Sequence, residues 1–167
     1  PKLRLAPMPE ASVRIAELAA SKQVDIGLMA MPVIDPATSC DLIFETASVC
    51  VLPLQHPLAQ KDRIEAADIG DETFIAMGRE DGSRQAVERS LDEAGVRVEP
   101  RFEAHFGDSA CALVAEGLGI SIVDPFAAER WRGLIAIRPF EPRVPCHVYL
   151  TRSRSHVSSL LQQLGLP

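Results

Sequence analysis

The stretch GLGISIVDP, residues 117–125, joins the end of a helix to a short strand that is broken again at once. The residues before it, DSACALVAEG, place apolar side chains at helical spacing, and Gly117 and Gly119 turn this helix into the next element. The run ISIV favours a buried strand because apolar and β-branched residues dominate it. Asp124 and Pro125 then end the strand at a sheet edge. Such a direct switch from helix to buried strand is typical of α/β folds.

Helices and strands alternate along the rest of the chain in the same way. The spacing of apolar residues predicts helices at residues 11–21, 83–95 and 157–165. The run VDIGLMAM, residues 24–31, is apolar almost throughout, which is typical of a strand covered on both faces. Further strands are expected at residues 2–6, 41–54 (a strand pair), 73–77, 96–106, 120–123, 134–140 and 146–153. The pattern predicts α/β lobes with mostly parallel sheets.

Length and charge limit the classes of function. The chain has 167 residues, of which 47% are hydrophobic, and this suits one compact globular unit or two small lobes. Its net charge of -6 and the lack of a run of Lys or Arg argue against nucleic acid as a partner of this segment. No apolar run approaches the roughly 18 residues of a membrane span, so a cytoplasmic location is expected.

The cysteines and the catalytic motifs give little sign of chemistry. Cys40, Cys50, Cys111 and Cys146 are scattered and show no metal-binding spacing. We expect them to be small packing residues in a reducing compartment, with a disulfide as the alternative. The sequence contains no GxSxG, HExxH or P-loop motif. We therefore predict no metal, no cofactor and no enzymatic activity.

The candidate binding residues follow from the predicted strands, because ligands of α/β proteins collect at the carboxyl ends of strands. A helix that starts at such a strand end also offers free N–H groups and the positive end of its dipole, which suit a carboxylate ligand. The residues predicted to bind a ligand are Met31, Met77, Gly78, Ser83, His105, Phe106, Gly107, Asp108 and Pro125.

Each of these residues also has a structural interpretation. Asp108 and Ser83 can instead cap their own helices. His105 ends a strand, where it would either contact a ligand or be a satisfied structural histidine. Pro125 and Phe126 would either line the pocket or have a hydrophobic packing role, and Met29 and Met31 can be plain core residues. The sequence leaves these alternatives open.

Four segments together resemble one protein family. They are VDIGLMAMP (24–32), VLPLQHPLA (51–59), LVAEGLGISIVDP (113–125) and YLTRSRSHVSSLLQQL (149–164). In this order and spacing they resemble the effector-binding domain of LysR-type transcriptional regulators. The resemblance implies a two-lobed fold like type 2 periplasmic binding proteins. In that fold two crossing strands join two α/β lobes, and a small-molecule effector binds in the cleft between them.

The resemblance also implies boundaries and a way of working. The first regulatory lobe would comprise residues 1–74 and 141–167, and the second would comprise residues 75–140. The crossovers would fall near residues 74–76 and 135–139. Closure of the lobes on an effector would bias the assembly between two DNA-bound geometries. The resemblance further implies that the first strand and helix of the domain, and the helix-turn-helix before them, would be missing from this segment, so we do not expect it to bind DNA itself.

Effector and partners are likewise expectations from the resemblance. The GLGISIVDP segment looks most like members that respond to amino acids or opines, so a small, amino-acid-like carboxylate is expected, with an aromatic acid as the alternative. The family implies a homodimer, and a tetramer of the full-length regulator. A solute-binding receptor of a transport system shares the two-lobed fold and is the alternative function.

Overall fold

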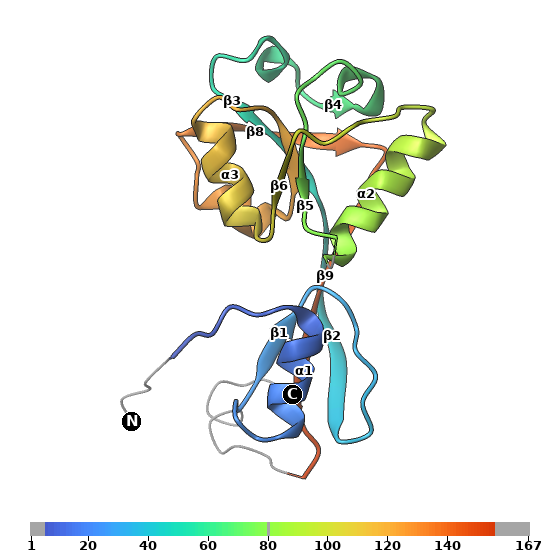
Figure 1. Ribbon diagram of the computed structural model, residues 1–167, viewed down its shortest axis with the longest axis vertical. Helices are drawn as coiled ribbons and strands as arrows, with labels where there is room; N and C mark the ends of the chain where they lie inside the picture. The colour runs from blue at the N-terminus through green and yellow to red at the C-terminus, as the bar shows by residue number, and fades with distance from the viewer. Residues whose placement is uncertain (1–5, 80, 156–167) are drawn as a thin grey trace. The chain divides into compact units, whose positions relative to one another are not determined.

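The computed structural model describes residues 6–79 and 81–155 of the chain (Figure 1). The chain divides into two compact units. Unit 1 comprises residues 1–44 and 147–167, and unit 2 comprises residues 45–146. The strand expected at residues 2–6 lies almost entirely outside the described residues, and the helix expected at residues 157–165 lies wholly outside them.

Unit 1 is a small sheet with one helix packed on it. The sheet has the strand order β1-β9-β2, and β1 runs antiparallel to β9. A Cβ atom on Gly27 would overlap the side chain of Ile15, so α1 can pack directly on β1 only because glycine stands there. The elements are α1 (Ser12–Ala20), β1 (Gly27–Met29), β2 (Thr38–Ala47) and β9 (Pro145–Ser153).

The strand predicted at residues 24–31 is shorter and less covered than expected. Only Gly27–Met29 form β1, and the side chain of Leu28 is 56% exposed. Leu28 pairs with Leu150 of β9, which is fully buried. The prediction of a strand covered on both faces is therefore wrong at Leu28, whose side chain is largely exposed.

Unit 2 is built around β3, which lies between two antiparallel partners. The larger sheet has the order β4-β8-β3-β7, and β5 and β6 form a parallel pair. A parallel bridge between Phe74 and Ile120 and a hydrogen bond from Ser121 Oγ to the Ile75 carbonyl (2.7 Å) join β7 to β5. The strands are β3 (Val49–Pro53), β4 (Ile64–Glu65), β5 (Ile75–Met77), β6 (Phe102–Ala104), β7 (Ser121–Val123) and β8 (Ile135–Glu141).

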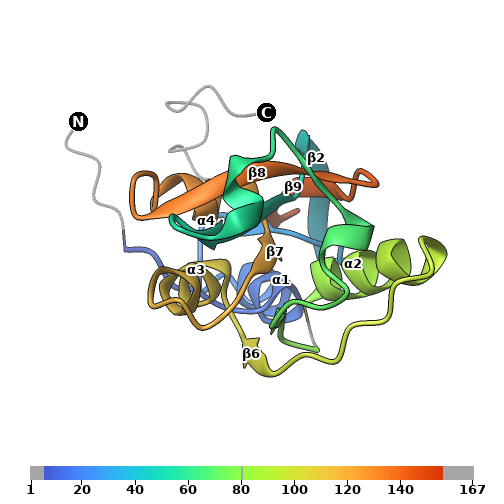
Figure 2. The ribbon, with the colours of Figure 1, turned by 90° about the horizontal axis from the view of Figure 1, so that it is seen from above.

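Helices cover these strands from two sides, and Figure 2 shows α2 and α3 on either side of β7. Val87 and Leu91 of α2 pack in one buried cluster with Phe74 and Ile122. Ala110, Cys111 and Val114 of α3 pack in another with Val51, Ile75 and Val123. The helical elements are α2 (Gly82–Glu93), α3 (Gly107–Ala115), α4 (Pro125–Glu129) and the 3-10 turns η1 (Pro57–Gln60) and η2 (Ala66–Asp68).

The helix-to-strand switch at residues 117–125 is confirmed. Gly117 has a φ of 76°, which lets the chain leave α3, and Gly119 has a φ of 155°. A Cβ atom on Gly119 would overlap the carbonyl oxygen of Thr73. That same carbonyl accepts a hydrogen bond from the Ile120 N–H at 2.9 Å. Glycine is therefore required where the chain joins β7 to the segment that leads into β5.

Two expectations about the sheets need correction. The residues expected to form a strand pair at 41–54 belong to β2 and β3, but these strands lie in different sheets, and the boundary between the two units falls within β2, after residue 44. The sheets are mixed rather than mostly parallel, since β3 is antiparallel to both β7 and β8. The compact units divide at residues 44 and 146; the regulatory lobes with boundaries at 74 and 140 stay a prediction.

No helix among the described residues has the length and apolar character to span a membrane.

Candidate functional site

The carboxyl ends of β5, β6 and β7 lie at one edge of unit 2. Met77 at the end of β5 pairs with Ala104 at the end of β6, and the Gly78 N–H donates to the Ala104 carbonyl at 2.9 Å. Each of these strands is followed by a helix, so the N-termini of α2, α3 and α4 follow the same edge. We call this region the strand-end edge and define it as residues 77–83, 104–109 and 123–126, apart from residue 80.

The start of α2 is capped by its own carboxylate. Asp81 is the N-cap, and its Oδ1 accepts a hydrogen bond from the Ser83 N–H at 2.8 Å. Ser83 is the second residue of the helix and half-buried, so the interpretation of Ser83 as a cap is wrong. The helix begins one residue earlier than the sequence suggested, at Gly82, because the Asp81 side chain caps it by accepting from the Ser83 N–H. A contact of Ser83 with a ligand stays a prediction.

The start of α3, in contrast, has no side-chain cap. Phe106 is the N-cap residue and offers no hydrogen-bonding side chain. Asp108 lies within the first turn, where its Oδ1 accepts from Trp131 Nε1 at 3.0 Å and approaches Arg130 Nη1 at 3.7 Å. The interpretation of Asp108 as a helix cap is therefore wrong, because the helix starts at Gly107 and turns the carboxylate toward Trp131. The first N–H groups of α3 remain uncapped by any side chain.

The start of α4 is capped and packs closely on α3. Asp124 Oδ1 accepts a hydrogen bond from the Ala127 N–H at 2.8 Å, and Pro125 occupies the first helical position. A Cβ atom on Gly107 would lie 2.9 Å from Ala127 Cβ and 3.0 Å from Asp124 Oδ2. Glycine at position 107 thus allows the Asp124 carboxylate to approach the uncapped start of α3.

The strand-end edge carries the negatively charged side chains of Asp81, Asp108 and Asp124. Burial, and after it the carboxylates of Asp124 and Asp81, raise the pKa of the Cys146 thiol to about 11. Burial, and after it the carboxylates of Asp124 and Asp108, raise the pKa of the Cys111 thiol to about 12. Both thiols are therefore protonated at neutral pH. All four cysteines are free, and the described residues contain no cluster of His, Cys, Asp and Glu that would hold a metal ion.

The structure brings most of the predicted binding residues to this edge. Gly78 is buried, His105 is exposed, and Phe106 is 49% exposed. Met31 is the exception, because it follows β1 and belongs to unit 1. Asp81 and Asp124 were missed, although an Asp directly before Gly82 or Pro125 at a strand-to-helix junction is a recognisable capping signal.

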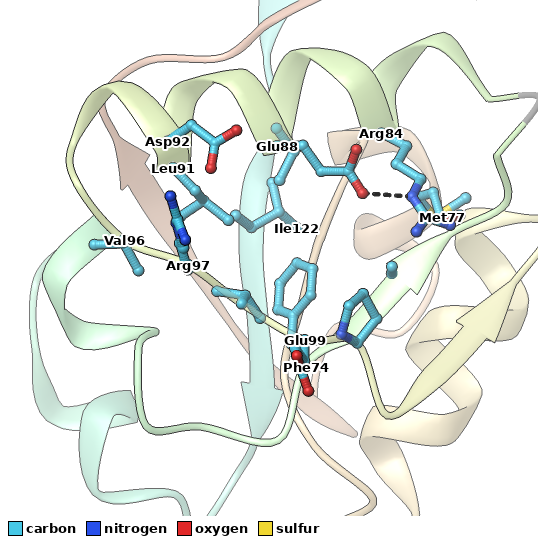
Figure 3. Close-up of a pocket in the computed structure, with 14 residues that line it drawn as sticks. Phe74, Met77, Arg84, Glu88, Leu91, Asp92, Val96, Arg97, Glu99 and Ile122 are labelled. Carbon is cyan, nitrogen blue, oxygen red and sulfur yellow. Dashed lines mark hydrogen bonds and ion pairs between the residues drawn. The ribbon is translucent and has the colours of Figure 1, made fainter.

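A separate pocket of about 320 Å³ lies in unit 2 beside α2 (Figure 3). The buried side chains of Phe74, Leu91 and Ile122 give the pocket an apolar lining. Charged residues of α2 and of the segment 96–100 also line it. Of the predicted binding residues, only Met77 lines it. The pocket and the strand-end edge meet at the end of β5.

Comparison with known proteins identifies related sequences. A family model described as the LysR substrate binding domain matches residues 1–164. The transcriptional activator protein LysR of Escherichia coli (strain K12) is 33% identical over 165 residues, which are 98% of this chain and 53% of that protein. The octopine catabolism/uptake operon regulatory protein OccR of Rhizobium meliloti is 32% identical over 143 residues, which are 84% of this chain and 46% of that protein. The chain spans about half the length of these relatives.

A solved structure shares the fold. The effector binding domain of QuiR, in complex with shikimate, superimposes with a TM-score of 0.75 at 19% identity, over 93% of this chain and 75% of that one. The fold class predicted from the sequence, like that of type 2 periplasmic binding proteins, is thereby confirmed.

Proposed function

Because this chain belongs to the LysR substrate-binding domain family, we propose that it senses a small-molecule effector for a LysR-type transcriptional regulator. The relatives LysR and OccR are named as regulators of transcription, which supports regulation rather than catalysis. The chain spans about half of their length. Binding to DNA is accordingly proposed for a part of the regulator outside this chain.

The proposed effector is a small, amino-acid-like carboxylate that binds at the strand-end edge. The uncapped start of α3 carries this proposal, because α2 and α4 are capped by Asp81 and Asp124 while α3 has no side-chain cap. Free N–H groups and the positive end of the helix dipole favour an anion at that place. The effector's carboxylate would accept hydrogen bonds from the first N–H groups of α3.

The carboxylates around this place favour an effector that also carries a cation. Asp124 Oδ2 lies close to Gly107, at the start of α3, and Asp81 and Asp124 both raise the pKa of Cys146. A purely anionic ligand would be repelled by these groups, whereas the ammonium group of an amino acid would pair with them. An amino acid or opine satisfies both requirements, and OccR is named for octopine catabolism and uptake.

An aromatic acid is the second candidate for the effector. Phe106 is 49% exposed at the N-cap of α3, and Phe126 is 49% exposed in the first turn of α4. Two partly exposed Phe side chains at a strand-end edge would cover the flat face of a ring. The QuiR domain binds shikimate, a cyclic acid, in a protein of the same fold. A transport receptor is not favoured, since the related sequences are transcriptional regulators.

Calorimetric titration of the chain with octopine, lysine and benzoate tests the ligand class. We expect octopine or lysine to bind with saturation, and lysinamide, which lacks the carboxylate, to bind at least tenfold more weakly. Binding of benzoate alone would replace the amino-acid-like effector with an aromatic acid. No heat from any of them, with the chain folded by circular dichroism, would contradict the proposed ligand class.

Other properties of the regulator rest on the family alone. We propose that it forms homodimers, and tetramers in full-length form, and that it acts in the cytoplasm. Lobe closure on the effector, transmitted to a helix-turn-helix domain, is the proposed mode of action. Analytical ultracentrifugation of the full-length regulator with and without effector measures the first of these properties.

A further inference from the structure

Arg84 in the first turn of α2 has a buried guanidinium group with three acceptors. The residue is only 8% exposed. Its Nη1 donates to the Met77 carbonyl at 3.0 Å and to Glu103 Oε2 at 2.8 Å, and its Nε donates to Glu88 Oε1 at 2.7 Å. Figure 3 shows the Arg84 side chain directed at Met77 and Glu88. A charge this deeply buried is stable only when it is paired and hydrogen-bonded.

The partners of Arg84 lie on two neighbouring strands and on its own helix. Met77 is the last residue of β5, Glu103 is the middle residue of β6, and Glu88 follows one turn later on α2. The carbonyl of Met77 is the point at which the chain leaves β5 and enters the loop toward α2. The Arg84 side chain thereby links the end of β5, where the loop begins, to the adjacent strand β6 and to its own helix α2.

We propose that Arg84 is a positioning residue for effector binding, which holds residues 78, 79 and 81–83 of the strand-end edge in their binding geometry. The proposal rests on the proposed function, since it assigns that edge to the effector. Three predicted binding residues depend on this geometry. The Met77 carbonyl accepts a hydrogen bond from Arg84, Gly78 is the residue after Met77, and Ser83 is the residue before Arg84. Arg84 itself faces Met77 and Glu88 and acts through the loop.

The chemistry of the guanidinium group explains why arginine is needed. The hydrogen bonds that Arg84 donates to Glu88 and Glu103 raise the pKa of Arg84, and the bond from Arg84 lowers the pKa of Glu103, so the charges of Arg84 and Glu103 persist at physiological pH. The planar fork directs Nε to one acceptor and Nη1 to two others. Lysine has a single nitrogen on a flexible stem and cannot hold the same spread of acceptors in one geometry.

Hydrogen exchange in the R84K variant separates positioning from general stabilisation. The loop has amides whose protection can be followed, because the Asp81 N–H donates to the Gly78 carbonyl at 2.9 Å and the Ser83 N–H donates to Asp81. We expect exchange at Asp81 and Ser83 to accelerate at least tenfold in R84K, while exchange in β3 stays within twofold. R89K, the same change at an exposed position of α2, is the matched control and leaves both unchanged.

Two outcomes of the exchange measurement would overturn the proposal. Unchanged exchange at Asp81 and Ser83 in R84K would show that the loop does not depend on Arg84. Equal acceleration in the loop and in β3 would show that Arg84 only stabilises unit 2 as a whole. If R84K fails to fold, E103Q serves instead, because it keeps Arg84 and weakens only the bond to β6; it is expected to accelerate the loop's exchange severalfold.

Titration with octopine measures the effect on binding. We expect R84K to bind octopine at least tenfold more weakly than the unmodified chain, and R89K to bind it within twofold. Equal affinity of R84K and the unmodified chain would overturn the positioning role. If the unmodified chain itself does not bind octopine, the proposed ligand fails, and the exchange measurement alone decides the role of Arg84.

Discussion

The indole Nε1 of Trp131 donates a hydrogen bond to the carboxylate of Asp108 at 3.0 Å. This bond joins the first turn of α3 to the chain just beyond α4, in a region where Gly107 already packs against Ala127. Trp131 is half-buried, and it is the single tryptophan of the chain. The bond therefore fixes a carboxylate beside the proposed effector site and places a spectroscopic reporter there.

Replacing Trp131 by phenylalanine tests the energetic value of this bond. W131F keeps an aromatic ring and removes the N–H donor, so unfolding in urea is expected to need about 1 kcal/mol less free energy. The phenylalanine variant lacks the tryptophan signal, so circular dichroism must follow the unfolding. R132K, at an exposed position next to it, is the control. An unchanged midpoint would show that water replaces the indole N–H at no cost.

Effector binding is expected to change the fluorescence of Trp131. The indole contacts Asp108, whose helix presents the uncapped N–H groups proposed to bind the carboxylate. A ligand there alters the field around the ring and its access to water. We expect a saturable shift of the emission maximum with octopine, with the midpoint found by calorimetry. A calorimetric signal without any fluorescence change would place the ligand elsewhere.

Substitution of Gly119 by alanine is expected to destabilise unit 2 strongly. A Cβ atom there would overlap the Thr73 carbonyl, and the φ of 155° is itself unfavourable for alanine. The expected loss is about 2 to 3 kcal/mol, the range of backbone strain with an added steric conflict. G133A is the matched control, because Gly133 has a φ of 88° with nothing within 4 Å of the added atom. It should lose about 1 kcal/mol. Equal losses in the two variants would mean that Thr73 moves aside freely.

The raised pKa of the Cys146 thiol predicts that the folded chain loses stability at alkaline pH. Its pKa is raised in the folded chain from 9.0 to about 11, so the unfolded chain gives up this proton at lower pH than the folded chain does. The stabilising contribution is complete below pH 9 and is lost as the pH rises toward 11. We expect the free energy of unfolding to fall less steeply over this window in C146S.

Reactivity gives an independent check of the same shift. Alkylation requires the thiolate, so Cys146 should react slowly with iodoacetamide at pH 8, and its rate should rise up to about pH 11. D124N removes one of the nearby carboxylates and keeps an oxygen that can cap α4. The rate profile should move to lower pH in D124N. Identical profiles would mean that burial alone raises the pKa.

Local signals in the sequence were sufficient to predict several helices, strands and turns. The turn at Gly117 after α3, the strand within residues 73–77 and the helix within residues 83–95 were all predicted, since each depends on residues within one or two turns of the chain. The strand-end edge followed from a general rule of α/β sheets, and the resemblance of four segments identified the family.

What the sequence by itself determined is the alternation of helices and strands, the turn at Gly117 and Gly119, and the family. The tertiary structure alone decided which strands pair, that Asp108 bonds Trp131 instead of capping α3, and that Arg84 is buried against Met77 and Glu103. The reason is physical: backbone conformation responds to neighbouring residues, whereas a polar side chain takes whichever partner folding brings within about 3 Å of it. Asp108 and Trp131 are separated by more than twenty residues, and no local pattern joins them.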